Sequence, residues 1–510
     1  MTPKPRRALL VVSIMLATVM QTLDSTIANV ALPHMQGSMS ATQDEISWVL
    51  TSYIIAAAIA TPATGFLAHR FGRKNLLLIA ISGFTVTSML CGMATSLPEI
   101  VIFRLIQGAF GASFVPLSQT IMLDMFPIEQ RGKMIALWGN GVMVGPIMGP
   151  ALGGWLTDNY SWRWVFYINL PFGILAFLGM MISLSETREK MTKQIDWAGF
   201  AFLSLAIGGV QIMLDRGNVK DWFSSTEIVT YAIVGSISFY LFVTHSLTTR
   251  QPFIDLSLFR DRNLSVGLCV AFIVGFVLYA TMALMPPFLE SLMNYPVTTA
   301  GLVIAPRGIG TMLAMSIAGR IINRIDPRFI IAGGLSLASL SLWEMTLFNL
   351  DVSTQTIVMT GLLQGFGLGF IFAPLTTISF ATLAPNLRPE GTSLYSLLRN
   401  VGSSVGIAVS QAIITRLVQI NHASIAEKVT ITNPLYRSGA IPHIFDPNTR
   451  LGIAALNAEV TKQASVISYL NDFRLMMFMT LIAIPFVFLM RPITHSGDLR
   501  DEERAHMVMD

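Results

Sequence analysis

Gly65-Phe-Leu-Ala-His-Arg70 recurs 254 residues later as Gly319-Arg-Ile-Ile-Asn-Arg324, and this repetition sets the architecture of the chain. Further matches flank the pair in the same chain order, at offsets between 254 and 258 residues: Leu105-Ile-Gln-Gly108 with Leu362-Leu-Gln-Gly365, Pro116-Leu-Ser118 with Pro374-Leu-Thr376, Arg131 with Arg388, and Gly145 and Gly149 with Gly402 and Gly406. Because order and offset hold over more than 80 residues, the matches indicate an internal repeat rather than chance.

The composition indicates an integral membrane protein. The 510 residues are 53% hydrophobic and only 12% charged, whereas a soluble domain has about 25% charged residues. So few charges could not cover a surface in water, so most of this surface must face membrane lipids. A bilayer is spanned by about 20 apolar residues. The sequence predicts fourteen such spans, at 8–32, 46–68, 75–95, 98–120, 133–157, 163–184, 197–214, 226–248, 263–289, 299–321, 329–349, 355–376, 392–415 and 473–490.

The basic residues test this number of spans. With the N-terminus in the cytoplasm, the cytoplasmic segments contain most of the basic residues, as the positive-inside rule requires: Lys4, Arg6, Arg7, Arg70, Arg73, Lys74, Arg131, Lys133, Arg188, Lys190, Lys193, Arg250, Arg260, Arg262, Arg320, Arg324, Arg328 and Arg388. The short external loops contain only Arg163, Arg216 and Lys220. An odd number of spans would destroy this asymmetry, so we predict an even number and two cytoplasmic termini.

Repeat and spans together predict an all-α membrane fold with two six-helix halves, at 8–184 and 263–490. Both halves begin on the same side, so they are parallel repeats related by an axis along the membrane normal. A linker, 185–262, holds the two extra helices. The other parts are an N-terminal segment, 1–7, an external loop, 416–472, and a tail, 491–510. Two similar halves can rock and open a site between them to one side at a time.

The sequence argues against several other functions. The net charge of +4 comes from the basic residues of the cytoplasmic segments and does not indicate that the protein binds nucleic acid. An ATP-driven pump is not expected, because the chain has no GxxxxGK[ST] phosphate loop. The seven histidines do not cluster at ligand spacing, and Cys91 and Cys269 lie alone in apolar runs, so no metal site is predicted. We therefore expect a protein that is not an enzyme.

Four sets of residues together resemble the major facilitator superfamily over nearly the whole chain. They are Leu23-Asp-Ser-Thr-Ile-Ala-Asn-Val-Ala-Leu-Pro33, the turn from Gly65 to Lys74, Arg104 with Gln107-Gly108, and the glycine- and proline-rich motif that begins at Gly141. More narrowly, the chain resembles the fourteen-helix drug:proton antiporters of the EmrB/QacA type. The stretches 211–217, 222–225 and 255–259 are similar to the EmrB branch. The resemblance implies a multi-pass protein of the bacterial inner membrane that uses the proton as its coupling ion and needs no other cofactor.

Asp24, about two-thirds through the first predicted helix, is a candidate proton site. A charge at mid-bilayer costs about 2.5–3.5 kcal/mol on insertion scales. Burial favours the neutral acid and a nearby cation favours the carboxylate, so such a group can exchange a proton as its surroundings change. A structural acid that binds a neighbouring helix is the alternative. Thr26 and Asn29, within about a turn of Asp24, could donate hydrogen bonds to it or be ordinary packing polar residues.

Arg104 lies at a comparable depth in the fourth predicted helix and cannot be discharged, so it needs an acidic or carbonyl partner. We expect it to face Asp24 and to stabilise the carboxylate when substrate is absent. The resemblance likewise implies a role in proton coupling. Further intramembrane candidates for a substrate cavity are Gln107, Arg307, Glu344 and Arg399. Arg307 and Arg399 have no evident partner in the sequence, and Glu344 could be a second acid.

The fifth predicted helix carries a stripe of small residues and prolines: Gly141, Gly145, Pro146, Gly149, Pro150, Gly153 and Gly154. Four of the glycines repeat every four residues, so they lie on one face, where missing side chains permit close backbone contact. The prolines remove backbone donors and favour a bend. Tight packing alone could explain the stripe. The resemblance implies that it marks exporters and seals one side against leak.

A short basic turn on the cytoplasmic side joins the second and third predicted helices: Gly65, Arg70, Gly72, Arg73 and Lys74. Its charges could serve orientation alone. The resemblance implies a conformational latch, so we expect a gating role and no contact with substrate. His69 stands where the family has an acid, and a latch salt bridge through this position is therefore in doubt.

The expected function is the export of small amphipathic drugs in exchange for protons. A proton-coupled importer on the same fold and a membrane sensor that does not transport are the alternatives. The glycine stripe argues against the importer, and a sensor has no need of an intramembrane acid–arginine pair. The loop at 416–472 is too long for a simple connector. The resemblance implies that it docks a periplasmic adaptor of the EmrA type, which would lead to an outer-membrane channel; a disordered or decorative loop is the alternative.

Overall fold

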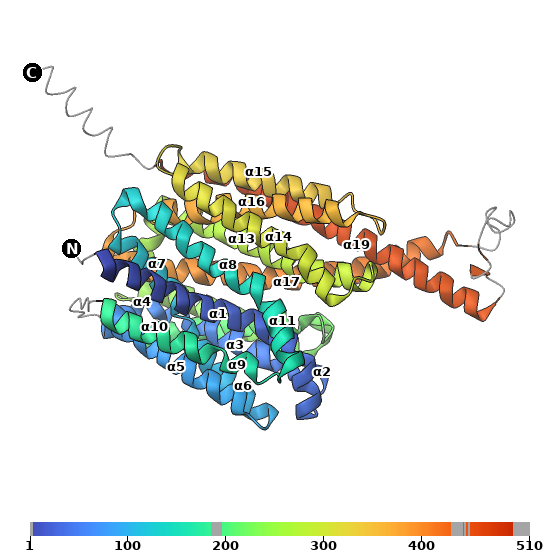
Figure 1. Cartoon of the computed structure of the whole chain (residues 1–510), viewed down its shortest axis with the longest axis horizontal. Coiled ribbons are helices and arrows are strands. Elements are labelled where there is room, and N and C mark those ends of the chain that lie inside the picture. Colours follow the sequence, from blue (N-terminus) through green and yellow to red (C-terminus); the bar gives the residue numbers. More distant parts are fainter. Residues whose placement is uncertain (1–3, 185–195, 430–441, 443–444, 447–448, 493–510) are drawn as a thin grey trace, which may run out of the picture.

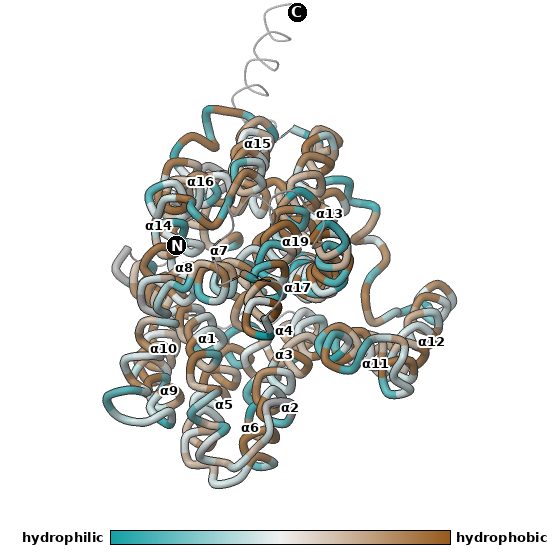
Figure 2. The backbone as a smooth tube through the Cα atoms, turned by 90° about the vertical axis from the view of Figure 1, so that its right-hand side faces the viewer, coloured by the Kyte–Doolittle hydropathy of each residue, from teal (hydrophilic) through white to brown (hydrophobic). Residues whose placement is uncertain are grey.

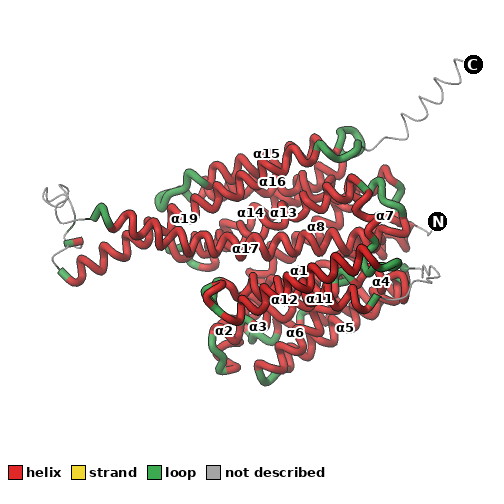
Figure 3. Tube along the Cα trace, turned by 180° about the vertical axis from the view of Figure 1, so that it is seen from behind, coloured by secondary structure: helices red, strands yellow, loops and turns green. Residues whose placement is uncertain are grey.

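The structure, a computed structural model, describes residues 4–184, 196–429, 442, 445–446 and 449–492. Several predicted segments lie partly outside the described residues. These are the N-terminal segment (1–3), the linker (185–195), the external loop (430–441, 443–444 and 447–448) and the C-terminal tail (493–510). Every regular element in the described ranges is helical, and none is a strand (Figure 3). The prediction of an all-helical membrane protein is confirmed. Figure 1 shows the helices running side by side along one direction.

The N half, residues 8–184, consists of six helical segments, three of which are broken. These segments are α1 (Lys4–Met39), α3 with α4 (Trp48–Ala60, Ala63–Phe71), α5 (Arg73–Met93), α6 with α7 (Leu97–Gly111, Phe114–Met125), α8 (Ile128–Asn159) and α9 with α10 (Trp164–Tyr167, Asn169–Ser183). A short helix, α2 (Gln43–Ile46), precedes α3. The bend between α3 and α4 measures 60°. It falls at Pro62, which has no N–H to continue the helical ladder.

The C half, residues 263–490, repeats this order with six helices. They are α13 (Arg262–Pro287), which continues into a π-helical turn (Phe288–Leu292), α14 (Val297–Ile321), α15 (Pro327–Met345), α16 (Thr354–Ser379), α17 (Arg388–Ala426) and α19 (Arg450–Val487). Equivalent glycines make equivalent contacts. A Cβ added at Gly108 would meet the backbone of Tyr53, and one at Gly365, 257 residues later, would meet the backbone of Arg307.

Two helices join the halves, α11 (Trp197–Gly217) and α12 (Thr226–Thr248). They pack on each other and stand at one side of the bundle (Figure 2). Asp196 fixes the start of α11: it accepts hydrogen bonds from the N–H groups of Gly199 (2.9 Å) and Phe253 (3.1 Å) and pairs with His245 (2.8 Å). Partial burial raises the pKa of Asp196, but the bonds from Gly199 and His245 outweigh it and hold that pKa below the usual value.

The number of membrane spans lies close to the prediction. Among the described residues, twelve helices are long and apolar enough to cross a bilayer, or thirteen if α3 and α4 form one bent span. The predicted span 329–349 corresponds to α15, which has 19 residues and packs between α16 and α19. A count of fourteen, with α15 included, stays a prediction.

The structure differs from the predicted loop 416–472. α17 continues through Ala426 and α19 starts at Arg450, so both helices extend past the other spans as a hairpin (Figure 1). No Gly or Pro occurs between Gly406 and Ala426, so nothing in that stretch ends the helix. We call the end of the bundle that holds the start of α1 and the end of α19 the basal end. The opposite end, which carries the hairpin, is the distal end.

Candidate functional site

Asp24, in the distal half of α1, is fully buried inside the N half. Its Oδ2 accepts a hydrogen bond from Nη1 of Arg104 on α6 at 2.6 Å. Its Oδ1 accepts from Nε2 of Gln107 at 3.0 Å and from Nδ2 of Asn169 at 2.8 Å. One arginine and two amides therefore surround the carboxyl and donate hydrogen bonds to both of its oxygens.

Arg104 is held as firmly as the acid. Its Nε donates to the backbone oxygen of Val49 at 3.1 Å, and its Nη1 also donates to Oε1 of Gln107 at 2.9 Å. The guanidinium carbon lies 4.2 Å from the ring centre of Tyr53, a cation–π contact. Only Nη2 is buried without a hydrogen bond to a described residue. The structure thus brings Asp24 and Arg104 together and connects α1, α3 and α6 through them.

The packing of α1, α6 and α10 depends on the charge of the Asp24 carboxyl. A proton on Asp24 would remove the charge that balances Arg104, and a buried charge that loses its partner destabilises the packing by about 3–5 kcal/mol. The neutral acid would also lose an acceptor position for one of the two amides. Protonation therefore favours separation of α6 and α10 from α1, the helix that carries the acid.

The structure corrects two expected neighbours of Asp24. The hydroxyl of Thr26 donates to the backbone oxygen of Gly145 on α8 at 3.1 Å, and Asn29 is exposed. Thr26 and Asn29 follow Asp24 by two and five residues, and side chains at these spacings lie on other faces of a helix. Neither side chain therefore contacts the carboxyl. The sequence-based reasoning missed Asn169, although it is an amide within the predicted span 163–184. Gln107, expected in a substrate cavity, lies one turn from Arg104 and belongs to the buried cluster.

The glycine stripe of α8 packs against α1, the helix of Asp24. A Cβ at Gly145 would lie 2.5 Å from the backbone carbon of Thr22, and one at Gly153 would lie 2.7 Å from a side-chain carbon of Ile27. Gly141 faces Met15, and Gly149 faces the Thr26 side chain. Gly154 points elsewhere, with its nearest atom 4.0 Å away. Despite Pro146 and Pro150, α8 stays one helix from Ile128 to Asn159. The stripe therefore seats α1 within the N half.

Two arginines of the C half are buried without a carboxylate partner among the described residues. Nη2 of Arg307 donates to Oγ1 of Thr281 at 2.8 Å and to the backbone oxygen of Leu278 at 3.2 Å, while its Nη1 has no hydrogen bond to a described residue. Thr281 follows Asp24 by 257 residues, within the repeat offset, so a hydroxyl stands where the N half has its acid. Arg399 contacts the ring of Phe372 at 5.5 Å, and its Nε is also unbonded within the described residues.

Glu344 does not join these arginines. It lies on α15, which packs on α16 and α19 within the C half, away from the contact between halves. Its Oε2 accepts a hydrogen bond from Oγ1 of Thr360 at 3.0 Å. The expected cavity position of Glu344 is therefore wrong for this conformation, because α15 is separated from the N half by its own neighbours.

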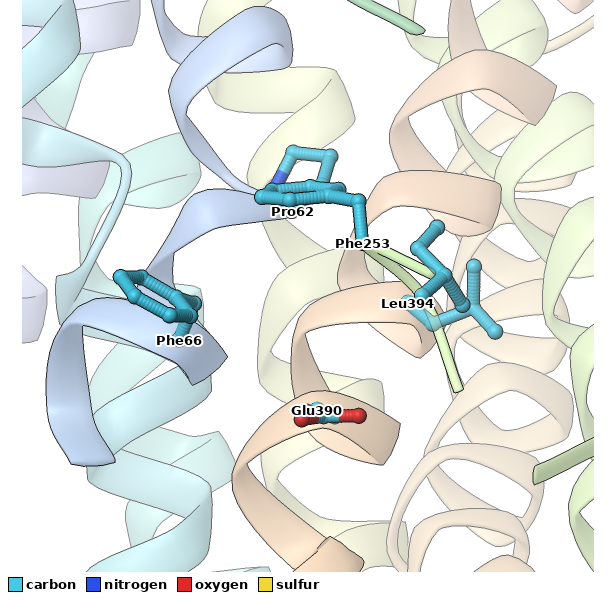
Figure 4. Close-up of a pocket in the computed structure, with 6 residues that line it drawn as sticks. Pro62, Phe66, Phe253, Glu390 and Leu394 are labelled. Atoms are coloured by element: carbon cyan, nitrogen blue, oxygen red, sulfur yellow. The ribbon is translucent and has the colours of Figure 1, made fainter. Parts of the chain in front are cut away.

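The halves meet along α8 and α14, and at the basal end α17 also packs on α4 and α7. Oγ1 atoms of Thr120 and Thr392 lie 2.8 Å apart across this contact, and Asp124 pairs with Arg388 of the C half. A small cavity remains beside it, lined by Pro62, Phe66, Phe253, Ile254, Glu390 and Leu394; Figure 4 shows Phe66 and Pro62 facing the helix of Glu390 and Leu394. The basal end of the bundle is thus closed.

The basic turn takes part in this closure unevenly. Arg73 pairs with Asp124, the residue that also binds Arg388. Lys74 donates from Nζ to the backbone oxygen of Met181 at 2.9 Å, and Arg70 is exposed. Gly72 has φ = 83°, a conformation that favours glycine, between α4 and α5. His69, in place of an acid, contacts the backbone oxygen of Asn386 at 3.0 Å, so position 69 still joins the halves without a carboxylate.

Gly65 should be essential for basal closure. A Cβ at this position would lie 2.8 Å from the Cα of Glu390, so Gly65→Ala should push α4 away from α17. Overpacking of this kind costs about 1–3 kcal/mol, which shifts a two-state equilibrium by about 5-fold or more. We expect a matching loss of disulfide formation between cysteines placed at Thr120 and Thr392, in a variant without the native cysteines. Gly333→Ala, with no atom within 4 Å, is the control; equal yields in both variants would contradict the prediction.

Two similar helical halves that close against each other at one end define a membrane transporter rather than an enzyme. The chain belongs to the Major Facilitator Superfamily, whose profile it matches over residues 14–407. It is 37% identical to the multidrug export protein EmrB of Haemophilus influenzae, over 84% of this chain and 85% of that protein. It is 34% identical to the fatty acid resistance protein FarB of Neisseria gonorrhoeae, over 95% and 96%. Among solved structures, it is similar to the human organic anion transporter MFSD10 (TETRAN), with a TM-score of 0.59 at 14% identity, over 94% of this chain and 100% of that chain.

Proposed function

We propose that the protein exports small amphipathic drugs across the bacterial inner membrane in exchange for protons, with its basal end in the cytoplasm. The observation that carries this proposal is the fully buried Asp24–Arg104 pair, in which an ionisable acid and its cation lie on different helices of one half. The similarity to multidrug export proteins supports the direction of transport and the class of substrate. The basic residues of the basal loops support the orientation.

The proposed cycle alternates between two arrangements of the halves. With the basal end open and Asp24 ionised, the protein takes a drug from the cytoplasm or the inner leaflet. The halves then rock and close the basal end, as in the conformation described above. Protonation of Asp24 from outside weakens its contact with Arg104 and displaces the drug, and the protonated form returns. One proton that crosses 100 mV supplies about 2.3 kcal/mol, and one pH unit adds about 1.4 kcal/mol.

Everted membrane vesicles test the direction and the coupling together. An exporter should load drug into such vesicles when their interior is acidified, and added drug should dissipate part of the proton gradient. An importer would empty them under the same gradient. A sensor that does not transport would leave both the drug and the gradient unchanged.

The distal hairpin of α17 and α19 suits a periplasmic partner. We infer that it docks an adaptor of the EmrA type, which would continue to an outer-membrane channel. The hairpin extends past the other spans and exposes apolar side chains, among them Ile420, Leu451 and Ile453. Photo-crosslinkers at Leu451 should capture such an adaptor, whereas crosslinkers on the exposed lateral residue Leu247 of α12 should not. Equal capture at both positions would remove the support for docking.

Arg307 is proposed to favour substrates with an acidic group. Its buried Nη1 has no hydrogen bond to a described residue, so a carboxylate or phenolate of an amphipathic substrate could supply the missing acceptor. The similarity to a fatty acid resistance protein is consistent with this chemistry. Arg307→Gln should reduce export of acidic amphipaths by about 10-fold or more, because a charged hydrogen bond contributes about 1.5–3 kcal/mol. Export of cationic dyes should change less. Arg320→Gln, exposed on the same helix, is the matched control. An equal loss for both substrate classes would contradict this assignment.

A further inference from the structure

A second buried carboxyl, that of Asp472, lies in the C half. It directly precedes the predicted span 473–490. Asp472 of α19 is 0% exposed and forms no ion pair with a described residue; the hydroxyl of Ser410 is the donor next to its carboxyl. A carboxylate that is buried without a cation is far less favourable than the neutral acid. The surroundings of Asp472 therefore favour the protonated form in this conformation.

No cation in the described part of the chain pairs with Asp472. Ser410 of α17 is buried, and its hydroxyl faces the carboxyl as a neutral hydrogen-bonding group. On α19, Tyr469 lies one turn away, with its ring centre 5.5 Å from that of Phe288. The site thus differs from that of Asp24, where an arginine and two amides bind the carboxyl.

The charged residues on the elements packed against α19 are engaged elsewhere or form no pair with Asp472 within the described part of the chain. Glu344 of α15 accepts a hydrogen bond from Thr360, and Arg399 of α17 lies against Phe372. Glu290 of the π-helical turn after α13 is only partly buried and makes no ion pair with Asp472. Asp472 is consequently governed by burial rather than by a neighbouring charge.

A polar route connects this acid with the distal side. Ser468 lies one helical turn further toward the distal end of α19, and its Oγ accepts a hydrogen bond from Nδ2 of Asn421 at 3.1 Å. Asn421 is partly exposed at the base of the hairpin. Hydrogen-bonding side chains therefore extend from the hairpin surface to within one turn of Asp472.

We propose that Asp472 is a second proton-binding site of the transport cycle, which takes up its proton from the distal side. The step is simple protonation: the carboxylate binds one proton to form the neutral acid and returns it when its surroundings change. α17 provides the coupling, because it carries Ser410 next to Asp472 and also packs on α4 and α7 at the basal closure. This inference rests on the proposed function, and it predicts that each drug molecule exchanges for one more proton than Asp24 alone can carry.

The test uses the purified full-length protein in proteoliposomes, with drug flux and proton flux measured together. Asp472→Asn should lower the number of protons released per drug molecule by one. Because asparagine resembles the neutral acid in size, the variant should keep the melting temperature of the wild type. Asp472→Glu should retain the wild-type ratio, and Asp351→Asn, which removes an exposed acid at the distal end, should leave it unchanged.

Each other result overturns a distinct claim. An unchanged ratio in Asp472→Asn, with coupling intact in the wild type, would show that Asp472 is structural. A marked fall in the melting temperature of Asp472→Asn would show that the acid is ionised at rest and would also overturn the inference. If the wild type itself moved no protons with drug, the proposed antiport would fail, and the inference would fail with it.

Discussion

Asp24→Asn is expected to abolish drug-driven proton movement. Asparagine keeps the size of the side chain but cannot bind and release a proton, so no exchange could be coupled at this site. Arg104 would keep its contacts with Val49 and Gln107 and lose the carboxylate at 2.6 Å. Everted vesicles that contain the variant should neither load drug on acidification nor release protons when drug is added. Retained antiport would overturn the assignment of Asp24.

Loss of coupling must be separated from loss of folding. Removal of one partner of a buried ion pair destabilises a protein by about 3–5 kcal/mol, so Asp24→Asn should also lower the melting temperature. The double variant Asp24→Asn with Arg104→Gln removes both charges and should recover much of this loss, because no uncompensated charge remains buried. It should not recover proton coupling. A double variant with normal stability and normal antiport would mean that the pair is only structural.

Gly145→Ala should cause the second largest effect. Its Cβ would lie 2.5 Å from the backbone carbon of Thr22, so α1 would have to move away from α8. The expected destabilisation is about 1–3 kcal/mol, and α1 carries Asp24 two residues further along. We expect lower thermal stability together with a fall of about 10-fold or more in drug export, as a 1.4 kcal/mol shift in a state's free energy changes its population tenfold.

The neighbouring Gly154 provides the matched control for this prediction. It belongs to the same motif and the same helix, but its added Cβ would have its nearest atom 4.0 Å away. Gly154→Ala should therefore leave stability and export close to the wild-type values. If both alanine variants exported drug normally, close packing of α1 on α8 would not be required for transport.

Much of the architecture could be predicted from the chain alone, because its signals are local or repeat at a fixed distance. Apolar runs of about 20 residues mark the helices, and an offset of 254 to 258 residues relates the halves. The partner of Arg104 was also predictable, since a buried guanidinium needs an acceptor and few acids occur within the spans. Gln107 could have been added to the cluster from its position three residues after Arg104 on the same helix.

Other features depended on contacts between distant helices. Asn169 reaches Asp24 because the start of α10 packs beside α1, and Thr26 turns instead to α8 because it lies on another face of its helix. Asp472 was not recognised as buried, because the apolar run after it begins one residue later and the helix before it is polar. The basal closure by Asp124 and Arg388 was equally hidden, since 264 residues separate the pair.

The sequence by itself determined the membrane setting, the two-fold repeat of the halves and the presence of an acid and an arginine inside the N half. Hydropathy, spacing and charge placement are properties of single segments, so they can be followed along the chain. Only the tertiary structure decided which donors surround Asp24, that Asp472 is buried without an ion pair to a described residue, and that the basal end is closed. Each of these features depends on which faces of the helices pack together. The side chains of one helix point in several directions, so the sequence of a single segment does not fix the face that contacts its neighbour.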